Sequence, residues 1–481
     1  MNLLKKILVL ILTLESRLII AKYKPFIVAI TGSVGKTSTK DAIYDVLKKQ
    51  SKYVRKSEKS LNSEIGLPLT IIGVPNAWRD LGGWSRNIME GLRLIFAKKE
   101  YPDCLILEIG ADHPGDIIKV GKWLHPDISV ITQISTTPVH VEFFSSPEEV
   151  FEEKAALAEA IKPSGTLVLF ADNEKVLSLA GRIKNKDVKV ISFGTVPSAQ
   201  VRGSEDRIIY MTQQGLEGHV EIPSPNISTI EILASTETLA DKLVNDSGAE
   251  VSNVRQTSQV KNPIGISFKL DMDGNSVPIS VNGVLGKTYL YPLLAAAAVG
   301  KVRNIPISSI VDSLNNYQAP KGRMSVILGL NGSTLIDDSY NSSPDAVSSA
   351  LQTLRELDCT GSKIVVLGDM MELGQYSSDE HRKIGREVVG IANTLVTVGQ
   401  RSRVTADEAI KSGLSIDSVR SFELSSEAGE YLKLIVRQGD IVLIKGSQSV
   451  RMEKTVKILL RESEKSGELL VRQEKEWLDK K

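Results

Sequence analysis

A short glycine-containing segment with a lysine and several hydroxyl residues is the part of this chain whose residue types most clearly indicate chemistry. It reads Thr-Gly-Ser-Val-Gly-Lys-Thr-Ser over residues 31–38. Glycines let the backbone curl so that its N–H groups point at an anion, and the start of a following helix adds partial positive charge. Lys36 can then reach the outer phosphates of a nucleotide, and Thr37 can offer its hydroxyl to Mg²⁺. The segment predicts a site for a nucleoside triphosphate.

Three further candidates follow predicted strands or lie on a predicted helix. Glu108 belongs to the apolar run 104–109 and lies at its end, where parallel α/β sheets gather ligand groups. A carboxylate there can hold Mg²⁺ against phosphates, since hard cations prefer oxygen ligands. His140 follows the next predicted strand, and Lys154 lies on a predicted helix over residues 148–160. Taken alone, the glutamate and the lysine are better explained as solvated surface charges.

An acidic and polar turn in the second half of the chain forms a fourth group of candidates. Residues 335–344 read Leu-Ile-Asp-Asp-Ser-Tyr-Asn-Ser-Ser-Pro, and Lys-Gly-Arg precedes them at 321–323. Turn chemistry accounts for the asparagine, the serines and the proline. The aspartates, the tyrosine and the arginine can in addition grip ribose, base and phosphate.

Short apolar runs that alternate with helical stretches must position these residues. The alternation indicates parallel sheets with crossover helices, and a length of 481 residues indicates two or three domains. Strands are predicted over residues 26–30, 104–109, 128–134, 166–170 and 188–193, and again over 334–337, 364–367, 394–398, 418–422 and 441–444. We therefore expect an α/β protein, with a phosphate-loop domain on a mostly parallel sheet and a C-terminal Rossmann-like α/β domain.

The expected domain boundaries follow from changes in composition along the chain. They are an apolar N-terminal helix over 1–22, a central ATP-binding domain over 23–316, a C-terminal domain over 317–462 and a charged tail over 463–481. Residues from about 207 to 260 have the character of an insertion, with a predicted helix over 228–247. The tail is expected to be a solvated helix or frayed.

The apolar N-terminal segment does not have the features of an export signal. Glu-Ser-Arg interrupts the apolar run at 15–17, the uninterrupted part is too short to span a bilayer, and no small-residue cleavage site follows. Two interpretations stay open: its apolar face packs on the protein, or residues 1–22 lie in a membrane interface with their lysines near the headgroups.

Charge and cysteine content narrow the function classes. A formal net charge of +1 leaves no electrostatic footprint for nucleic acid. Cys104 and Cys359 are far apart in sequence and indicate reduced thiols rather than a disulfide frame or a metal pair. We expect a cytoplasmic monomer, and peripheral contact with the inner face of the membrane through residues 1–22 is the alternative to a purely soluble protein.

Nine motifs in this order resemble the Mur ligase family, from residue 26 to about residue 460. They occupy residues 31–38, 61–70, 108–111, 140–142, 153–155, 321–323, 337–344, 367–374 and 445–453. Each is weak alone, and their shared order makes the resemblance specific. The segments Asp-Asp-Ser-Tyr-Asn and Gly-Asp-Met-Met-Glu-Leu-Gly are most similar to the branch that adds D-alanyl-D-alanine to a UDP-linked muramoyl peptide.

The resemblance implies an ATP-dependent amide ligase of peptidoglycan precursor synthesis. Such enzymes convert a substrate carboxylate to an acyl phosphate with ATP, and an amine then attacks it to give an amide, ADP and phosphate. The implied substrates are a UDP-N-acetylmuramoyl peptide and D-alanyl-D-alanine, with Mg²⁺, at two positions, as cofactor. Two cations would offset the repulsion between the carboxylate and the γ-phosphate.

The resemblance also assigns roles to particular residues. Those implied to hold ATP are Gly32, Ser33, Val34, Gly35, Lys36, Thr37, Ser38, Arg323, Asp338, Tyr340 and Asn341. Thr37 and Glu108 would hold one Mg²⁺, and His140 and a carbamylated Lys154 would serve the second. The implied catalytic residues are Lys36, His140 and Lys154, and those on the substrate side are Asn62, Asp369, Glu372, Lys445, Ser447 and Glu453.

Two departures from the family pattern keep other functions open. Family members usually begin with a separate domain that binds the UDP-sugar, whereas here only the apolar helix precedes the loop, and residues 286–292 differ at the usual adenine-contact positions. The alternatives are a ligase of the same superfamily with another acceptor, folylpolyglutamate-like or peptide-tailoring, and a non-catalytic nucleotide-binding module. The complete metal set speaks against the last.

Overall fold

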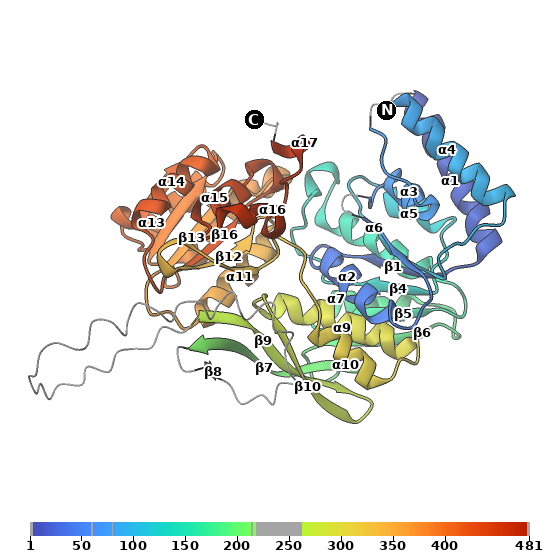
Figure 1. Ribbon diagram of the computed structural model, residues 1–481, viewed down its shortest axis with the longest axis horizontal. Helices are drawn as coiled ribbons and strands as arrows, with labels where there is room; N and C mark the ends of the chain where they lie inside the picture. The colour runs from blue at the N-terminus through green and yellow to red at the C-terminus, as the bar shows by residue number, and fades with distance from the viewer. Residues whose placement is uncertain (1–2, 59–60, 79, 213–214, 218–261, 479–481) are drawn as a thin grey trace, which may run out of the picture.

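Two α/β domains form the molecule, side by side along its long axis (Figure 1). The computed structural model describes residues 3–58, 61–78, 80–212, 215–217 and 262–478. The predicted fold class is confirmed, because each domain is built on a largely parallel sheet. Of the expected insertion, residues 207–212 and 215–217 are described and lie in strands, while the predicted helix over 228–247 lies outside the described residues.

The central domain is built on a sheet that has ten strands in the described part of the chain, in the order β10-β9-β7-β6-β5-β4-β1-β3-β2 with β8 beside β7. The strands are β1 (Phe26–Thr31), β2 (Val54–Lys56), β3 (Cys104–Glu108), β4 (Ile128–Ile131), β5 (Thr166–Phe170), β6 (Lys189–Gly194), β7 (Val201–Thr212), β8 (Gly215–Glu217), β9 (Asn262–Met272) and β10 (Asn275–Asn282). Strands β1 to β6 pair in parallel, and β7 to β10 form an antiparallel extension. Since β1 lies between β3 and β4, the chain segments that follow these three strands meet at one edge.

Helices cover both faces of this sheet. They are α1 (Leu3–Tyr23), α2 (Lys36–Leu47), α3 (Gly66–Ile72), α4 (Leu81–Phe96), α5 (Asp116–Gly121), α6 (Pro147–Glu159), α7 (Glu174–Leu177), α9 (Lys287–Val302) and α10 (Ile307–Asn315). The alanine run of α9 is fully buried against α2. Small side chains let these two helices approach closely, which fixes the direction in which α2 leaves the phosphate loop.

The C-terminal domain has a sheet of six strands among the described residues, in the order β11-β12-β16-β13-β14-β15, with β11 antiparallel and the rest parallel. The strands are β11 (Ser325–Leu328), β12 (Thr334–Asp338), β13 (Lys363–Gly368), β14 (Thr394–Val398), β15 (Val419–Phe422) and β16 (Ile441–Lys445). The helices are α11 (Pro344–Glu356), α12 (Ser377–Val388), α13 (Arg403–Lys411), α14 (Ser425–Ile435), α15 (Glu453–Leu459), α16 (Ser466–Leu469) and α17 (Lys475–Leu478).

Both ends of the chain differ from a simple solvated segment. In the tail, Leu470, Val471 and Arg472 are at most 5% exposed, so the expectation of a solvated or frayed tail is wrong for its middle part. Burial of Leu470 and Val471, together with the pairing of Arg472 with Glu453, anchors this part of the tail in the C-terminal domain. At the other end, one face of α1 packs on α3 and α4. None of the described helices is both long enough and apolar enough to cross a bilayer.

Candidate active site

The glycine loop follows β1 and has the backbone geometry that its sequence predicts. Gly32 has φ +148°, and a Cβ there would meet Thr132 Oγ1 at 1.9 Å. Gly35 has φ +84°, in the left-handed region, and directly precedes α2. A side chain is therefore excluded at the first position by space and disfavoured at the second by backbone strain.

The segment after β4 holds this loop in place. The backbone N–H groups of Ser33 and Val34 donate to the Gln133 carbonyl at 2.8 and 3.2 Å, and Thr132 Oγ1 donates to the Val34 carbonyl at 2.8 Å. The Ser33 hydroxyl is buried and has no hydrogen-bond partner in the described structure. An unpaired buried hydroxyl in such a loop is consistent with a polar ligand.

Two cations from different domains stand at the loop. Lys36 is the first residue of α2, and its Nζ donates to the Gly32 carbonyl at 2.8 Å. Burial lowers the pKa of Lys36, the Glu108 carboxylate opposes that shift, and the charge of Arg323 adds to it. Arg323 stacks on Tyr340 with 4.1 Å between its Cζ and the ring centre, and its buried Nε has no partner within the described residues. This arrangement suits a polyanion between the domains.

Thr37 and Glu108 meet beside the loop, as the sequence predicts for a cation site. Thr37 Oγ1 donates to the Glu108 carboxylate oxygens at 3.1 and 3.2 Å, because β3 lies next to β1 with Ile30 opposite Glu108. Lys40 Nζ, from a side chain only 3% exposed, lies 3.8 Å from Glu108 Oε2. Sequence reasoning missed Lys40, although its position one helical turn after Lys36 is a signal for the same helix face.

His140 connects the two domains. Its Nδ1 lies 2.7 Å from Glu372 Oε2 in the C-terminal domain, and its Nε2 lies 3.5 Å from Asp112 Oδ1. The hydrogen bond with His140 lowers the pKa of the Glu372 carboxyl. Both His140 and Glu372 have positive φ, 70° and 62°, which is strained for residues with side chains. Sequence reasoning missed Asp112, although it directly follows the motif at 108–111.

Lys154 is buried on α6, a helix with clear sequence signals for its start. Ser146 accepts from the Glu149 N–H at 3.3 Å, and Pro147 occupies the first turn. Lys154 is only 3% exposed, and burial lowers its pKa to about 7, with the charge of Lys36 acting in the same direction. A lysine with this pKa is partly a neutral amine at neutral pH, and therefore nucleophilic.

The neighbouring Glu153 explains how α6 is held near the site. Its carboxylate accepts N–H bonds at the start of α5, from Gly115 at 2.8 Å, Ile117 at 2.5 Å and Ile118 at 3.0 Å. A carboxylate at a helix start is stabilised by the helix dipole. The contact places α5 and α6, and with them Asp112 and Lys154, on one side of the loop.

The side chains implied to bind the two cations suit Mg²⁺ to different degrees, and the first pair suits it better. A hydroxyl and a carboxylate, as in Thr37 and Glu108, are oxygen ligands of the kind Mg²⁺ prefers. His140 and Lys154 offer no protein oxygen unless the lysine is carbamylated. Over the described ranges, three or more His, Cys, Asp or Glu side chains nowhere gather in a metal-binding group.

Several residues assigned to the nucleoside and the substrate are already paired inside the C-terminal domain. Lys445 Nζ is 2.6 Å from Asp338 Oδ2 and donates to the Asn341 carbonyl at 2.8 Å, and Lys445 is 1% exposed. Glu453, also 1% exposed, pairs with Arg472 at 3.0 Å and with Arg451. Direct ligand contact by Lys445 or Glu453 requires exchange of these partners.

Of the remaining substrate-side candidates, Asn62 contacts the segment after β3, and Asp369 and Ser447 contact each other in the C-terminal domain. The Gly110 N–H, just after β3, donates to the Asn62 carbonyl at 2.9 Å. In the C-terminal domain, the Ser447 N–H donates to the Asp369 carbonyl at 3.0 Å, and the Met371 N–H donates to Ser447 Oγ at 2.9 Å. Asp369 and Ser447 thus belong to one pair of crossed turns beside Glu372.

A cavity of about 520 Å³ opens between the two domains next to the loop. Gln133, Thr288 and Tyr291 line it, and they also line a small hollow beside Val34 and Gly35. Phe170 forms part of the wall and meets the Tyr291 ring edge-on, with 4.6 Å between the ring centres. Residues from α11 and α12 close the far side. Neither Tyr340 nor Asn341 lines this cavity.

Two family models and several known proteins are similar to this chain. The model of the Mur ligase middle domain matches residues 30–82 and 85–240, and that of the Mur ligase glutamate ligase domain matches residues 322–448. The chain is 24% identical to the UDP-N-acetylmuramoyl-tripeptide–D-alanyl-D-alanine ligase of Bacillus subtilis, over 90% of this chain and 76% of that protein. It is 27% identical to the ligase of the same name from Mycobacterium leprae, over 90% and 73%. The solved structure of MurF ligase from Thermotoga maritima with ADP superposes with a TM-score of 0.69, at 20% identity, over 95% and 84% of the two chains.

Proposed function

This chain belongs to the Mur ligase family, and we propose that it is an ATP-dependent amide ligase that adds D-alanyl-D-alanine to a UDP-N-acetylmuramoyl peptide. The relatives named above carry that activity in their names. The reaction activates a carboxylate as an acyl phosphate before the amine attacks. Because ATP and the nucleotide-linked peptide are the substrates, we place the reaction in the cytoplasm.

The single observation that carries the proposal is the meeting of the loop, the Thr37–Glu108 pair and Arg323 between two domains. The loop amides and Lys36 would hold the phosphates from one side, and Arg323 from the other. Such a split site is complete only when the domains are together, which excludes water from a hydrolysable acyl phosphate. A binding module that does not catalyse a reaction has no use for that arrangement.

For the cations, we propose Thr37 and Glu108 as ligands of one Mg²⁺, and His140 with carbamylated Lys154 at a second. When bound, Mg²⁺ neutralises the negative charge that phosphate and carboxylate bring together. The Lys154 amine would attack CO₂, form an N–C bond and release a proton to give a carbamate. Its burial and its pKa of about 7 support this, since the neutral amine is the form that reacts.

For the nucleoside, we propose that adenine enters the 520 Å³ cavity beside Gln133, Thr288 and Tyr291. Aromatic walls and a few polar groups are typical of such sites. The residues at 286–292 that differ from the family pattern thus still line the site, through other side chains. Asp338 and Tyr340 would then position Lys445 and Arg323 rather than contact the base.

A second candidate function is a ligase of the same family with another acceptor. The segments around Asp369, Glu372 and Ser447 would face the incoming amine. The conformation of the turns in these segments would decide which acceptor fits. The proposal of D-alanyl-D-alanine rests on the resemblance of those segments and on the names of the relatives.

The deciding experiment measures ADP release by the purified protein with UDP-N-acetylmuramoyl-tripeptide and D-alanyl-D-alanine, supplied separately and together. We expect release only when both are present. Release with the nucleotide peptide and a different amine would replace the proposal by the second candidate. Tight ATP binding without turnover on a broad panel of acceptors would show a nucleotide-binding module instead.

A further inference from the structure

Helix α1 is apolar on two opposite faces, and only one of them packs on the protein. Its buried face includes Leu12 and Ile19, both fully buried. The opposite face is a stripe of Ile7, Leu10, Leu14 and Leu18, which are 47%, 70%, 54% and 47% exposed. A helix that needed only one apolar face for packing would carry polar residues at these positions.

Helix α4 repeats this pattern beside α1. Asn87 and Leu94 are buried, whereas an exposed stripe of Leu81, Met89, Leu92 and Phe96 is 72%, 51%, 37% and 83% exposed. Ordinary surfaces carry single exposed apolar residues, but two neighbouring helices that each expose four large apolar side chains on one face are unusual in a soluble protein. We name these eight residues the apolar platform.

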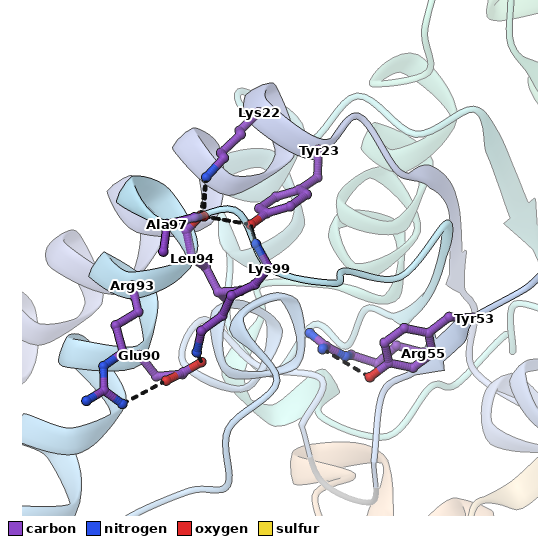
Figure 2. A network of polar contacts seen from close by, with 9 residues as sticks. All are labelled: Lys22, Tyr23, Tyr53, Arg55, Glu90, Arg93, Leu94, Ala97 and Lys99. Atoms are coloured by element: carbon purple, nitrogen blue, oxygen red, sulfur yellow. Dashed lines mark hydrogen bonds and ion pairs between the residues drawn. The ribbon is translucent and has the colours of Figure 1, made fainter.

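Contacts along α1 and α4 show that they run side by side in the same direction. Glu15 lies against Gly91, and the Lys22 ammonium donates to the carbonyls of Leu94 and Ile95 at 2.9 Å. Figure 2 shows the end of this contact, where Lys22 and Tyr23 reach the last carbonyls of α4. The two stripes therefore lie on adjacent helices rather than on separate parts of the molecule.

Both stripes face away from the body of the central domain. On α1, Tyr23 stacks on Tyr101 with 4.5 Å between ring centres, and Lys5 lies 3.5 Å from Glu64, so this side faces the body. At about 100° per residue, Leu10 and Leu14 lie on the opposite side of the helix. On α4 the same reasoning puts Met89 and Phe96 opposite Asn87, whose amide donates to the Pro75 carbonyl at 2.8 Å. Figure 1 shows the pair at the outer edge of the central domain, away from the C-terminal domain.

Basic side chains border the apolar platform. Residues 1–24 and 76–100 contain ten Lys or Arg against four Asp or Glu, in a chain whose net charge is only +1. By the same helical spacing, Lys6 and Arg17 flank the α1 stripe on one side, and Arg86 and Arg93 flank the α4 stripe on the other. Arg86 pairs with Asp80 and Arg93 with Glu90, whereas across the described residues neither Lys6 nor Arg17 makes an ion pair, and both are exposed.

We propose that the apolar platform docks on the surface of an anionic lipid bilayer, with α1 and α4 lying in the plane of the interface. An apolar face bordered by Lys and Arg matches acyl chains beneath acidic headgroups. Trp78, 70% exposed just before α4, adds an aromatic side chain of the kind that favours the interface. A second copy of the chain fits less well, because a two-fold contact would bring the basic borders of both copies together.

The test compares vesicles of phosphatidylcholine with vesicles of equal parts phosphatidylcholine and phosphatidylglycerol, in a flotation assay with the full chain. We expect binding to the mixed vesicles that weakens at least about tenfold with pure phosphatidylcholine and in high salt. The triple variant Leu10→Gln, Leu14→Gln, Phe96→Gln should lose this binding. The matched control Ile416→Gln, Leu424→Gln, Leu434→Gln removes equally exposed residues of the C-terminal domain, 68%, 58% and 83% exposed, and should bind like the wild type.

The flotation assay and the ADP-release assay distinguish membrane docking from the ligase reaction. Because the platform residues are exposed and away from the loop, ADP release in solution should be equal in the triple variant and the wild type, whichever amine is the substrate. Wild-type protein that stays unbound with mixed vesicles would overturn the proposal, as would a triple variant that still floats. A wild-type dimer that the triple variant abolishes in sedimentation velocity would also overturn it and would assign the platform to a second copy.

Discussion

Among the single residues of the site, Lys36 and Lys154 have protonation states that depend on their surroundings. Lys154 is buried beside the positive charge of Lys36, and both conditions favour its neutral form. Lys36 itself is buried but keeps the Glu108 carboxylate near it. A phosphate-binding lysine and a lysine that reacts with CO₂ need opposite protonation states, and the position of Glu108 next to the loop is consistent with that division.

Replacement of Lys154 by alanine should abolish ADP release, because the second cation would lose its oxygen donor. Short carboxylates such as acetate or formate should restore part of the activity, since they supply a similar oxygen pair in the vacated space. ADP release with both substrates, measured with and without added carboxylate, follows both effects. Lys175→Ala, which removes an exposed lysine paired with Glu148, is the control and should stay active. Full activity of Lys154→Ala would contradict the metal assignment.

At the scale of elements, the contact between α1 and α4 contains an unusual carboxylate. Glu15 is 4% exposed, neither of its carboxylate oxygens has a hydrogen-bond partner in the described part of the chain, and burial raises its pKa to about 7. The two helices approach closely here, since a Cβ built at Gly91 would lie 2.2 Å from Glu15 Oε2. The neutral form of the Glu15 carboxyl therefore fits this contact better than the charged form.

Glu15→Gln should make the stability of the protein less dependent on pH. In the wild type the folded-state pKa of about 7 lies above the ordinary value of 4.5. The penalty for ionising Glu15 is therefore absent at low pH, grows as pH rises through that interval and is complete above it. The melting temperature of Glu15→Gln should match the wild type near pH 4.5 and exceed it at pH 8 by roughly 1–3 °C, because a pKa shift of this size corresponds to at most about 3 kcal/mol and a chain of this length shifts by about 1 °C per kcal/mol.

Glu90→Gln is the matched control on the neighbouring helix, and the sign of its effect is opposite. In the wild type, the hydrogen bond between Glu90 and Lys99 lowers the pKa of the Glu90 carboxyl, and the nearby Arg93 lowers it further (Figure 2). That stabilisation exists at neutral pH and is lost as the carboxyl is protonated, so Glu90→Gln should lower the melting temperature only at higher pH. Parallel curves for Glu15→Gln and the wild type would contradict the assignment of a raised pKa.

At the scale of the whole molecule, the two domains meet directly across the site. The short helices η1 (Val141–Phe143) and η5 (Gly374–Tyr376) lie together, and His140 pairs with Glu372 beside them. Because the proposed site is complete only when the two domains are together, we expect each turnover to require opening and closing of this contact.

A disulfide across this contact should block turnover reversibly. A Cβ built at Gly374 lies 2.9 Å from Glu142 Cβ, somewhat closer than the about 3.5–4.5 Å of a disulfide, and both positions are exposed on short helices. The double variant Glu142→Cys, Gly374→Cys should lose ADP release when oxidised and regain it with a reducing agent. Each single cysteine variant is the control and should be indifferent to oxidation. Equal activity of the oxidised and reduced double variant would show that opening is not required.

The local features of this protein could be predicted from its amino-acid sequence. The loop at 31–38, the order of strands and helices, and the family follow from residue types at short spacings, because glycine conformation, apolar periodicity and helix starts are local properties. The strand predicted over 166–170 and the one over 394–398 have the bounds that the structure gives to β5 and β14. The roles of the individual site residues remain predictions.

Which charges are buried, paired or left exposed became known only from the folded structure. The contacts of His140 with Asp112 and Glu372, the burial of Lys154 and the pairing of Lys445 with Asp338 join segments that are far apart in sequence or lie on different elements. Likewise, residues 1–22 resemble an apolar helix in either interpretation, and packing of one face on α3 and α4 is what left the other face outward. Burial and ion pairing depend on distant neighbours, which spacing along the chain does not specify.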